Sequence, residues 1–128
     1  MKIRVALCFL CLLCNATPTG SSGSIDGIAS WYGEAHRGKL MANGETFNPD
    51  NLTAASWFHP FGTRLRVTAR SDPARSIVVT VTDRGPARRY VEAGRIIDLS
   101  LAAFKSLADP AQGLLEVTIT AAEPAPSR

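Results

Sequence analysis

Cysteine is missing from most of this chain, because Cys8, Cys11 and Cys14 are the only three and all lie within the first 16 residues. Beyond residue 16, therefore, neither a disulfide nor a thiolate metal site can form, and we expect no metal and no other cofactor. Small secreted domains often depend on disulfides. A domain here must instead be held together by its apolar core, for which roughly 100 residues suffice.

An excess of charge of one sign is also missing. Of the 14 lysines and arginines, Lys2 and Arg4 lie in the first 16 residues, which leaves 12 against 11 aspartates and glutamates. Nucleic-acid binding typically requires a clustered basic stripe. The densest basic group, Arg84, Arg88 and Arg89, is more typical of a solvated loop, so we expect no nucleic-acid partner.

Long hydrophobic runs are absent too, since none reaches the roughly 20 residues of a membrane-spanning helix. The apolar run over residues 5–14 follows a basic start, which is typical of a secretory signal over residues 1–16. Either the signal is cleaved after Ala16, or Cys14 carries a lipid. We expect an exported monomer that is attached to a membrane only through such a lipid. A flexible linker (17–25), one domain (26–122) and a tail (123–128) would follow.

Short β-strands dominate the pattern of the remaining chain. Residues 63–69 alternate with period two, and residues 76–82 are rich in β-branched side chains, both of which are typical of strands. Further strands are predicted at 27–32, 95–99 and 114–121, a long ordered loop at 33–51, a short helix or turn at 52–57, and a helix capped by Ser100 that runs through Leu107. This pattern predicts a small, mainly-β barrel.

Five segments in the same order carry a family resemblance. They are ASWYG (29–33), ANGE (42–45), LTAA with PFGT (52–63), TDRGP (82–86) and RIIDLS (95–100). Together they resemble the rare lipoprotein A (RlpA) family, and the similarity covers about residues 27–120. The resemblance implies a mainly-β fold, namely a six-stranded double-psi β-barrel with one or two short helices.

The resemblance also implies an activity. Family members are lytic transglycosylases, which cleave between N-acetylmuramic acid and N-acetylglucosamine, prefer strands stripped of stem peptides, and leave 1,6-anhydro ends. The expected partner is therefore the peptidoglycan glycan strand. A non-catalytic glycan-binding or expansin-like wall-loosening module is the alternative, because this sequence departs from the family at one position.

Two carboxylates are the candidate catalytic residues. Asp83 ends an apolar strand and matches the family's essential aspartate, so one carboxyl group could serve as acid and then base. Glu45 matches a functional glutamate. The family's histidine after LTAA is Ser56 here, and His59 could assist if residues 56–58 form one helical turn.

A further set of residues is predicted to contact substrate. Two of them are aromatic side chains that could stack on sugar rings, although core packing of the first strand explains them as well. Asp98 resembles a family position, and a structural hydrogen bond would also explain it. The predicted substrate-binding residues are Trp31, Tyr32, Asn43, Gly44, Thr53, Arg84, Gly85 and Asp98.

Overall fold

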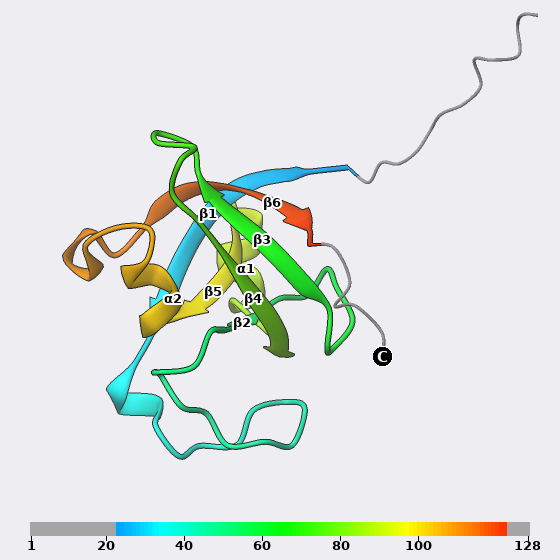
Figure 1. Ribbon diagram of the computed structural model, residues 1–128. Coiled ribbons are helices and arrows are strands. Elements are labelled where there is room, and N and C mark those ends of the chain that lie inside the picture. The colour runs from blue at the N-terminus through cyan, green and yellow to red at the C-terminus, as the bar shows by residue number, and fades with distance from the viewer. Residues whose placement is uncertain (1–22, 123–128) are drawn as a thin grey trace, which may run out of the picture.

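The computed structural model describes residues 23–122. The predicted signal over 1–16, Cys14, most of the linker and the tail lie outside the described residues. Within them, six strands close into one barrel in the order β1-β5-β2-β4-β3-β6 (Figure 1). The strands are β1 (Ile25–Tyr32), β2 (Thr53–Ala55), β3 (Arg64–Ala69), β4 (Ser76–Asp83), β5 (Arg95–Ser100) and β6 (Leu115–Ala121). The helices are η2 (Glu34–His36), α1 (Arg88–Glu92), α2 (Leu101–Lys105) and η3 (Pro110–Gln112).

The barrel mixes strand directions. β1 pairs with β5 and β2 with β4 in parallel, whereas the other four pairings are antiparallel. A parallel pair needs a crossover connection, and the two crossovers here carry the segments between β1 and β5 and between β2 and β4. A closed, mixed six-stranded barrel with two short α-helices confirms the double-psi fold predicted from the resemblance.

Apolar residues of alternating position fill the barrel. On β3, Leu65 and Val67 are fully buried, while Arg64 and Arg66, which alternate with them, are exposed. Phe104 of α2 is also fully buried and closes the core from outside the strands. Residues 23–122 contain no cysteine, so no disulfide can link them. The apolar packing holds the domain together, as the sequence predicted.

The predicted cap of α2 is present, but the helix is shorter than expected. The Ser100 hydroxyl accepts a hydrogen bond from the Ala103 backbone N–H at 3.3 Å, as an N-cap residue does. The helix ends at Lys105. Leu107 nevertheless packs into the core with 2% exposure, because the turn after the helix keeps it on the same side.

The prediction of a helix or turn at residues 52–57 was wrong, because Thr53–Ala55 form strand β2. Ala54 pairs with Val81 of β4 on one side and with Leu99 of β5 on the other. A three-residue strand that is rich in alanine has little β-propensity of its own. Its conformation is set by two neighbouring strands that supply backbone hydrogen-bond partners, and no local sequence pattern records that.

Helix α1 was not predicted, since residues 88–92 are short and have no side-chain N-cap. In the part of the chain that the structure describes, no helix is long and apolar enough to cross a membrane.

Candidate functional site

Asp83 and Asp98 lie at the same level on either side of β2. Ala55 is the register partner of Asp83 on β4 and of Asp98 on β5. The register shifts between Ala54 and Ala55, so that Asp83 and not Thr82 is opposite Ala55; such irregularities re-aim side chains. Two strand spacings put the Cα atoms of the two aspartates about 10 Å apart.

The Asp83 carboxylate is held by the backbone through one of its oxygens. Its Oδ1 accepts hydrogen bonds from the N–H groups of Arg84 at 2.8 Å and Ala42 at 2.9 Å. Its Oδ2 faces the Tyr32 hydroxyl at 3.5 Å. Because two N–H donors occupy Oδ1, a proton on this side chain belongs on Oδ2, which is the oxygen left to exchange it.

Asp98 is a second carboxyl group at the same site, and it is half-buried. The hydroxyl of Ser30, its register partner on β1, donates a hydrogen bond to it. Burial raises the pKa of Asp98, and the nearby Asp83 charge raises it further, while the Ser30 hydrogen bond and Arg95 partly oppose this. A Cβ atom on Gly85 would lie 3.2 Å from the Asp98 carboxylate oxygen Oδ2, so glycine leaves space beside this group.

Tyr32 connects the two aspartates with the long loop that follows β1. Its ring stacks on Phe47 with 4.2 Å between centroids, and His36 meets it edge-on at 5.5 Å. Burial raises the pKa of the Tyr32 hydroxyl well above its ordinary value, and the charges of Asp83 and Asp98 add to this. The hydroxyl therefore stays protonated and acts as a donor toward Asp83. Phe47 was not predicted as a site residue, although a lone aromatic in a polar loop was a usable signal.

The predicted turn at Asn43 and Gly44 docks on the end of β4. The Asn43 backbone N–H donates to the Thr82 carbonyl at 3.2 Å, and Gly44 adopts a positive φ of 94° that the turn requires. Glu45, the predicted second catalytic carboxylate, is exposed, and its Oε1 accepts from the Asn43 side-chain amide at 3.1 Å. The structure thus places Glu45 at the rim of the site, beyond the pair formed by Asp83 and Asp98.

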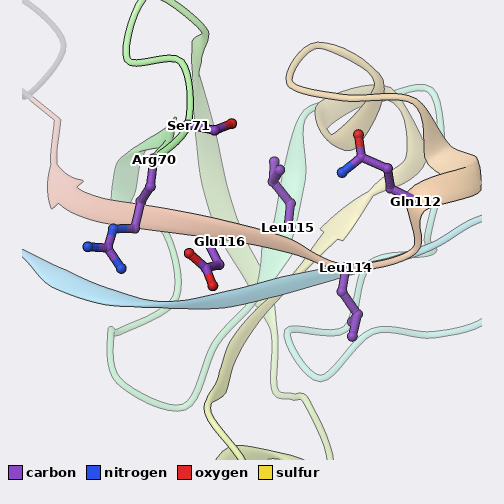
Figure 2. A pocket seen from close by; sticks show the side chains of 6 residues that line it. All are labelled: Arg70, Ser71, Gln112, Leu114, Leu115 and Glu116. Carbon is purple, nitrogen blue, oxygen red and sulfur yellow. The ribbon is translucent and has the colours of Figure 1, made fainter.

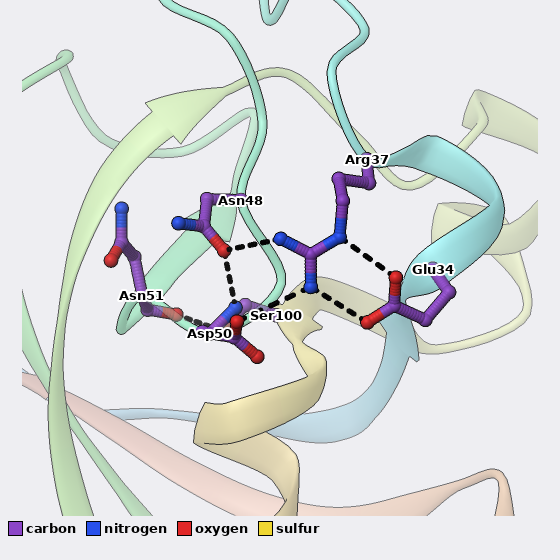
Figure 3. A network of polar contacts seen from close by, with 6 residues as sticks. All are labelled: Glu34, Arg37, Asn48, Asp50, Asn51 and Ser100. Carbon is purple, nitrogen blue, oxygen red and sulfur yellow. Dashed lines mark hydrogen bonds and ion pairs between the residues drawn. The ribbon is translucent and has the colours of Figure 1, made fainter.

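A polar network holds this loop against the barrel (Figure 3). The Arg37 guanidinium donates two hydrogen bonds to Glu34, each of 2.8 Å, and reaches Asp50 at 3.2 Å. The Asn51 carbonyl accepts from the hydroxyl of Ser100 at the start of α2. The loop that carries Asn43 to Glu45 is therefore ordered at both ends.

Ser56 and His59 are brought together, although not by a helical turn. Residues 57–59 form bends, and the Ser56 hydroxyl accepts from the Phe58 N–H at 3.0 Å and lies 3.3 Å from His59 Nδ1. Which of these two groups donates to the other depends on the tautomer of the imidazole. Burial lowers the pKa of His59, so the ring is neutral at neutral pH.

The Arg84 side chain contacts segment 56–61. Its Nη1 donates to the carbonyls of Ser56 and His59, both at 2.7 Å, and its guanidinium lies 4.0 Å from the centre of the Phe61 ring. The Ser56 N–H in turn donates to the Asp83 carbonyl at 3.0 Å. Segment 56–61 is therefore fastened directly beside the strand end that carries Asp83.

Two predicted substrate-contacting residues are not brought to this place. Trp31 donates its indole N–H to the Pro110 carbonyl at 3.0 Å and lies 6.4 Å from Phe104 between ring centroids, which is the core packing that the sequence also allowed. Thr53 lies two residues before Ala55, and its buried hydroxyl oxygen has no hydrogen-bond partner.

Within residues 23–122, no group of three or more histidines, cysteines, aspartates or glutamates could hold a metal ion. A separate pocket lies at the opposite end of the barrel. It is bordered by Arg70 and Ser71 after β3 and by Gln112, Leu114, Leu115 and Glu116 before and within β6 (Figure 2).

Comparisons of the sequence with a family model and with curated proteins identify one family. A family model described as lytic transglycolase matches residues 24–119. The probable endolytic peptidoglycan transglycosylase RlpA of Synechocystis sp. is 44% identical over 93 residues, which cover 73% of this chain and 27% of that protein. The endolytic peptidoglycan transglycosylase RlpA of Campylobacter jejuni is 45% identical over 94 residues, 73% of this chain and 32% of that protein. The chain thus spans about a third of these relatives or less.

A solved structure confirms the fold independently. A mutant expansin of Clavibacter michiganensis in complex with cellohexaose superimposes with a TM-score of 0.60 at 19% identity, and the match covers 82% of this chain and 54% of the expansin. At this identity the likeness establishes the barrel.

Proposed function

Because this chain belongs to the lytic transglycosylase family of RlpA-like double-psi β-barrels, we propose that it is an endolytic peptidoglycan lytic transglycosylase. It cleaves the β-1,4 bond between N-acetylmuramic acid and N-acetylglucosamine, preferably in strands without stem peptides. The names of the relatives support the substrate. The observation that carries the proposal is Asp83, whose Oδ1 is fixed by two backbone N–H groups while Oδ2 faces a protonated tyrosine.

Asp83 acts first as acid and then as base. Oδ2 gives its proton to the glycosidic oxygen while the bond from that oxygen to C1 of muramic acid breaks. The same carboxylate then takes the proton of the muramic acid 6-hydroxyl, whose oxygen bonds to C1 and closes the 1,6-anhydro ring. No water enters, and Asp83 ends the cycle protonated. One positioned carboxyl group can do both steps.

Asp98 and Tyr32 support this chemistry from two sides. Tyr32 donates toward Oδ2 and orients it, and its uncharged state is secured by its raised pKa. Asp98, on the other side of β2, has a raised pKa, so the two carboxyl groups have different environments, as paired catalytic carboxyls do. Glu45 contacts the sugar strand from the rim, together with Asn43 and Gly44, and Arg84 and Gly85 shape the floor.

The protein acts outside the cytoplasm, because its substrate is there. Residues 1–16 direct export, and the barrel works in the periplasm or at the outer membrane as a monomer. Whether a lipid on Cys14 or cleavage after Ala16 ends the signal is decided by mass spectrometry of the mature N-terminus.

A glycan-binding barrel without cleavage is the second candidate. It is favoured by Ser56, whose buried hydroxyl replaces the family histidine and is already occupied by Phe58 and His59. In the proposed enzyme, His59 supplies the imidazole in place of that histidine.

The deciding experiment incubates the protein with glycan strands stripped of peptides and identifies the products by mass spectrometry. We expect 1,6-anhydro ends from the wild type and none from Asp83→Asn. Reducing ends would indicate a hydrolase. Binding without either product, unchanged in Asp83→Asn, would establish the second candidate.

A further inference from the structure

A shallow groove lies beside the candidate site, between segment 56–61 and helix α1. Trp57, Phe58, Arg88, Val91 and Glu92 line it, and its volume is about 200 Å³. Residues 88, 91 and 92 share one face of α1, because positions three and four apart on a helix are neighbours. Trp57 and Phe58 keep 39% and 48% of their surface exposed, although both are large apolar side chains.

The groove continues the site already described. The Trp57 indole N–H donates to the Pro86 carbonyl, and the preceding residue, Ser56, donates its N–H to the Asp83 carbonyl. Asp83 and Arg88 are five residues apart and therefore at most about 18 Å apart. A sugar strand that reaches Asp83 can thus extend into the groove.

Arg88 gives the groove a positive charge that has no ion-pair partner in the part of the chain that the structure describes. Its guanidinium lies over the Trp57 ring, 4.6 Å from the centroid, and among residues 23–122 it forms no ion pair within 4 Å. Between residues 84 and 95 there are four arginines and one glutamate. The indole holds the guanidinium in place by a cation–π contact, while its N–H donors remain available to an anion.

From this arrangement we infer that the groove is a subsite for a muramic acid residue with a free lactyl carboxylate. The inference rests on the proposed function for the identity of the strand. The pyranose packs on Trp57 and Phe58, whose apolar faces suit the C–H groups of a sugar ring. The lactyl carboxylate binds Arg88, and Glu92 accepts a hydrogen bond from the amide or a hydroxyl group. In strands that carry stem peptides this carboxylate is an uncharged amide, so Arg88 selects peptide-free strands.

The test compares two hexasaccharides that differ in the lactyl group. Binding of chitohexaose and of a peptide-free hexamer of alternating N-acetylglucosamine and N-acetylmuramic acid is measured by calorimetry in an Asp83→Asn background, which prevents turnover. Arg88→Gln should weaken binding of the muramic acid hexamer about 5- to 10-fold and leave chitohexaose within about twofold. The preference for the charged hexamer should also shrink as salt is raised, because exposed ion pairs are screened.

Matched variants separate charge, stacking and folding. Arg89→Gln removes the same charge from the same helix, but its guanidinium lies over Tyr90, so it should change neither affinity more than about twofold. Trp57→Ala should weaken both ligands, whereas Trp57→Phe keeps a ring and should retain most of the affinity. Circular dichroism checks that each variant is folded.

Three results would overturn the subsite. One is an Arg88→Gln variant that binds like Arg89→Gln. Another is equal loss of both hexasaccharides in Arg88→Gln, since the carboxylate would then not be recognised. The last is tighter binding of peptide-bearing strands that depends on Arg88, which would assign the contact to peptide carboxylates. None of these results bears on cleavage by Asp83, and a wild type without anhydro products could still show the Arg88-dependent preference.

Discussion

The two ends of the β3–β4 hairpin are built from similar residue types and differ in how those residues are held. At the end of β4, the Asp83 side chain accepts hydrogen bonds from two backbone N–H groups, and β2 separates it from the half-buried Asp98. At the opposite end, Arg70 and Glu116 border a pocket of about 470 Å³ and are both exposed (Figure 2). Arg70 pairs loosely with Asp26 at 3.8 Å.

This difference shows that space alone does not mark a site. The pocket beside Arg70 has volume and charge, but its side chains are solvated and can be replaced at little cost. At the Asp83 end the polar groups are partly buried and fixed by the backbone, and the Asp83 charge lies close enough to raise the pKa values of Tyr32 and Asp98. Catalytic sites need such positioned and perturbed groups.

The two ends should differ most when one carboxylate at each end is neutralised. Asp83→Asn should lower the rate of glycan cleavage by about 100-fold or more, the usual scale for a lost acid/base group. Glu116→Gln should change the rate by no more than about twofold. Production of anhydro ends per unit time measures both. A comparable loss in Glu116→Gln would mean that the pocket in Figure 2 takes part in catalysis.

A second contrast concerns two serines. Ser56 is 1% exposed and its hydroxyl accepts the Phe58 N–H, so Ser56→Ala leaves a donor without its partner and should lower the free energy of unfolding by about 1–3 kcal/mol. Ser71 at the pocket end is exposed, and Ser71→Ala should change the free energy of unfolding by less than about 0.5 kcal/mol. Urea denaturation measures both. If Ser56→Ala and Ser71→Ala had the same free energy of unfolding, segment 56–61 would not be held more firmly than the pocket end.

A third contrast uses pH. The pKa of Asp98 is raised in the folded state, so the folded protein holds its proton at pH values where the unfolded chain has lost it, and its contribution to stability is lost as pH rises. The free energy of unfolding of the wild type relative to Asp98→Asn should therefore decrease as pH rises above the ordinary aspartate pKa of about 3.9.

Asp26→Asn serves as the control at the other end, because Asp26 is exposed. Its stability relative to the wild type should vary less with pH over the same range. Chemical denaturation at several pH values tests both variants. A flat profile for Asp98→Asn relative to the wild type would contradict the burial of Asp98 as the cause of its raised pKa.

The smallest expected effect concerns the polar network of Figure 3. Its charges are exposed, so Arg37→Ala should leave global stability almost unchanged. Hydrogen exchange of the loop amides of Met41 and Phe47, which are bonded within the loop, should become a few-fold faster. Arg70→Ala should leave those amides unaffected. Unchanged exchange in Arg37→Ala would show that Tyr32 and Phe47 order the loop without the network.

Much of the barrel could be read from the sequence, because most of its strands carry their own pattern. β3 alternates between exposed arginines and buried aliphatic residues, and Ser100 is an N-cap by its residue type. β2 could not be read in this way. Its three residues have no periodicity, and only the backbones of β4 and β5 on either side make them a strand.

The candidate site could be predicted in part. Asp83 was proposed because it ends a strong strand and matches the essential aspartate of the family that the sequence resembles. The approach of His59 to Ser56 was allowed by their spacing, although a bend and not a helix brings them together. The pairing of Asp83 with Asp98 depends on the register shift in β2, which no sequence pattern reveals. The contact of Tyr32 with Phe47 bridges a loop without period.

The placement of Ala55 between Asp83 and Asp98 also constrains how this barrel can evolve. The two carboxyl groups are separated by a whole number of strand spacings. A substitution can therefore change the length of a side chain, but it cannot move one carboxyl group gradually away from the other. An insertion or deletion of one residue in β2 would turn its side chains to the other face, and Asp83 and Asp98 would no longer lie opposite the same residue. We therefore expect adaptation to a different polysaccharide to occur in the loops, whose length can change without moving Asp83 relative to Asp98.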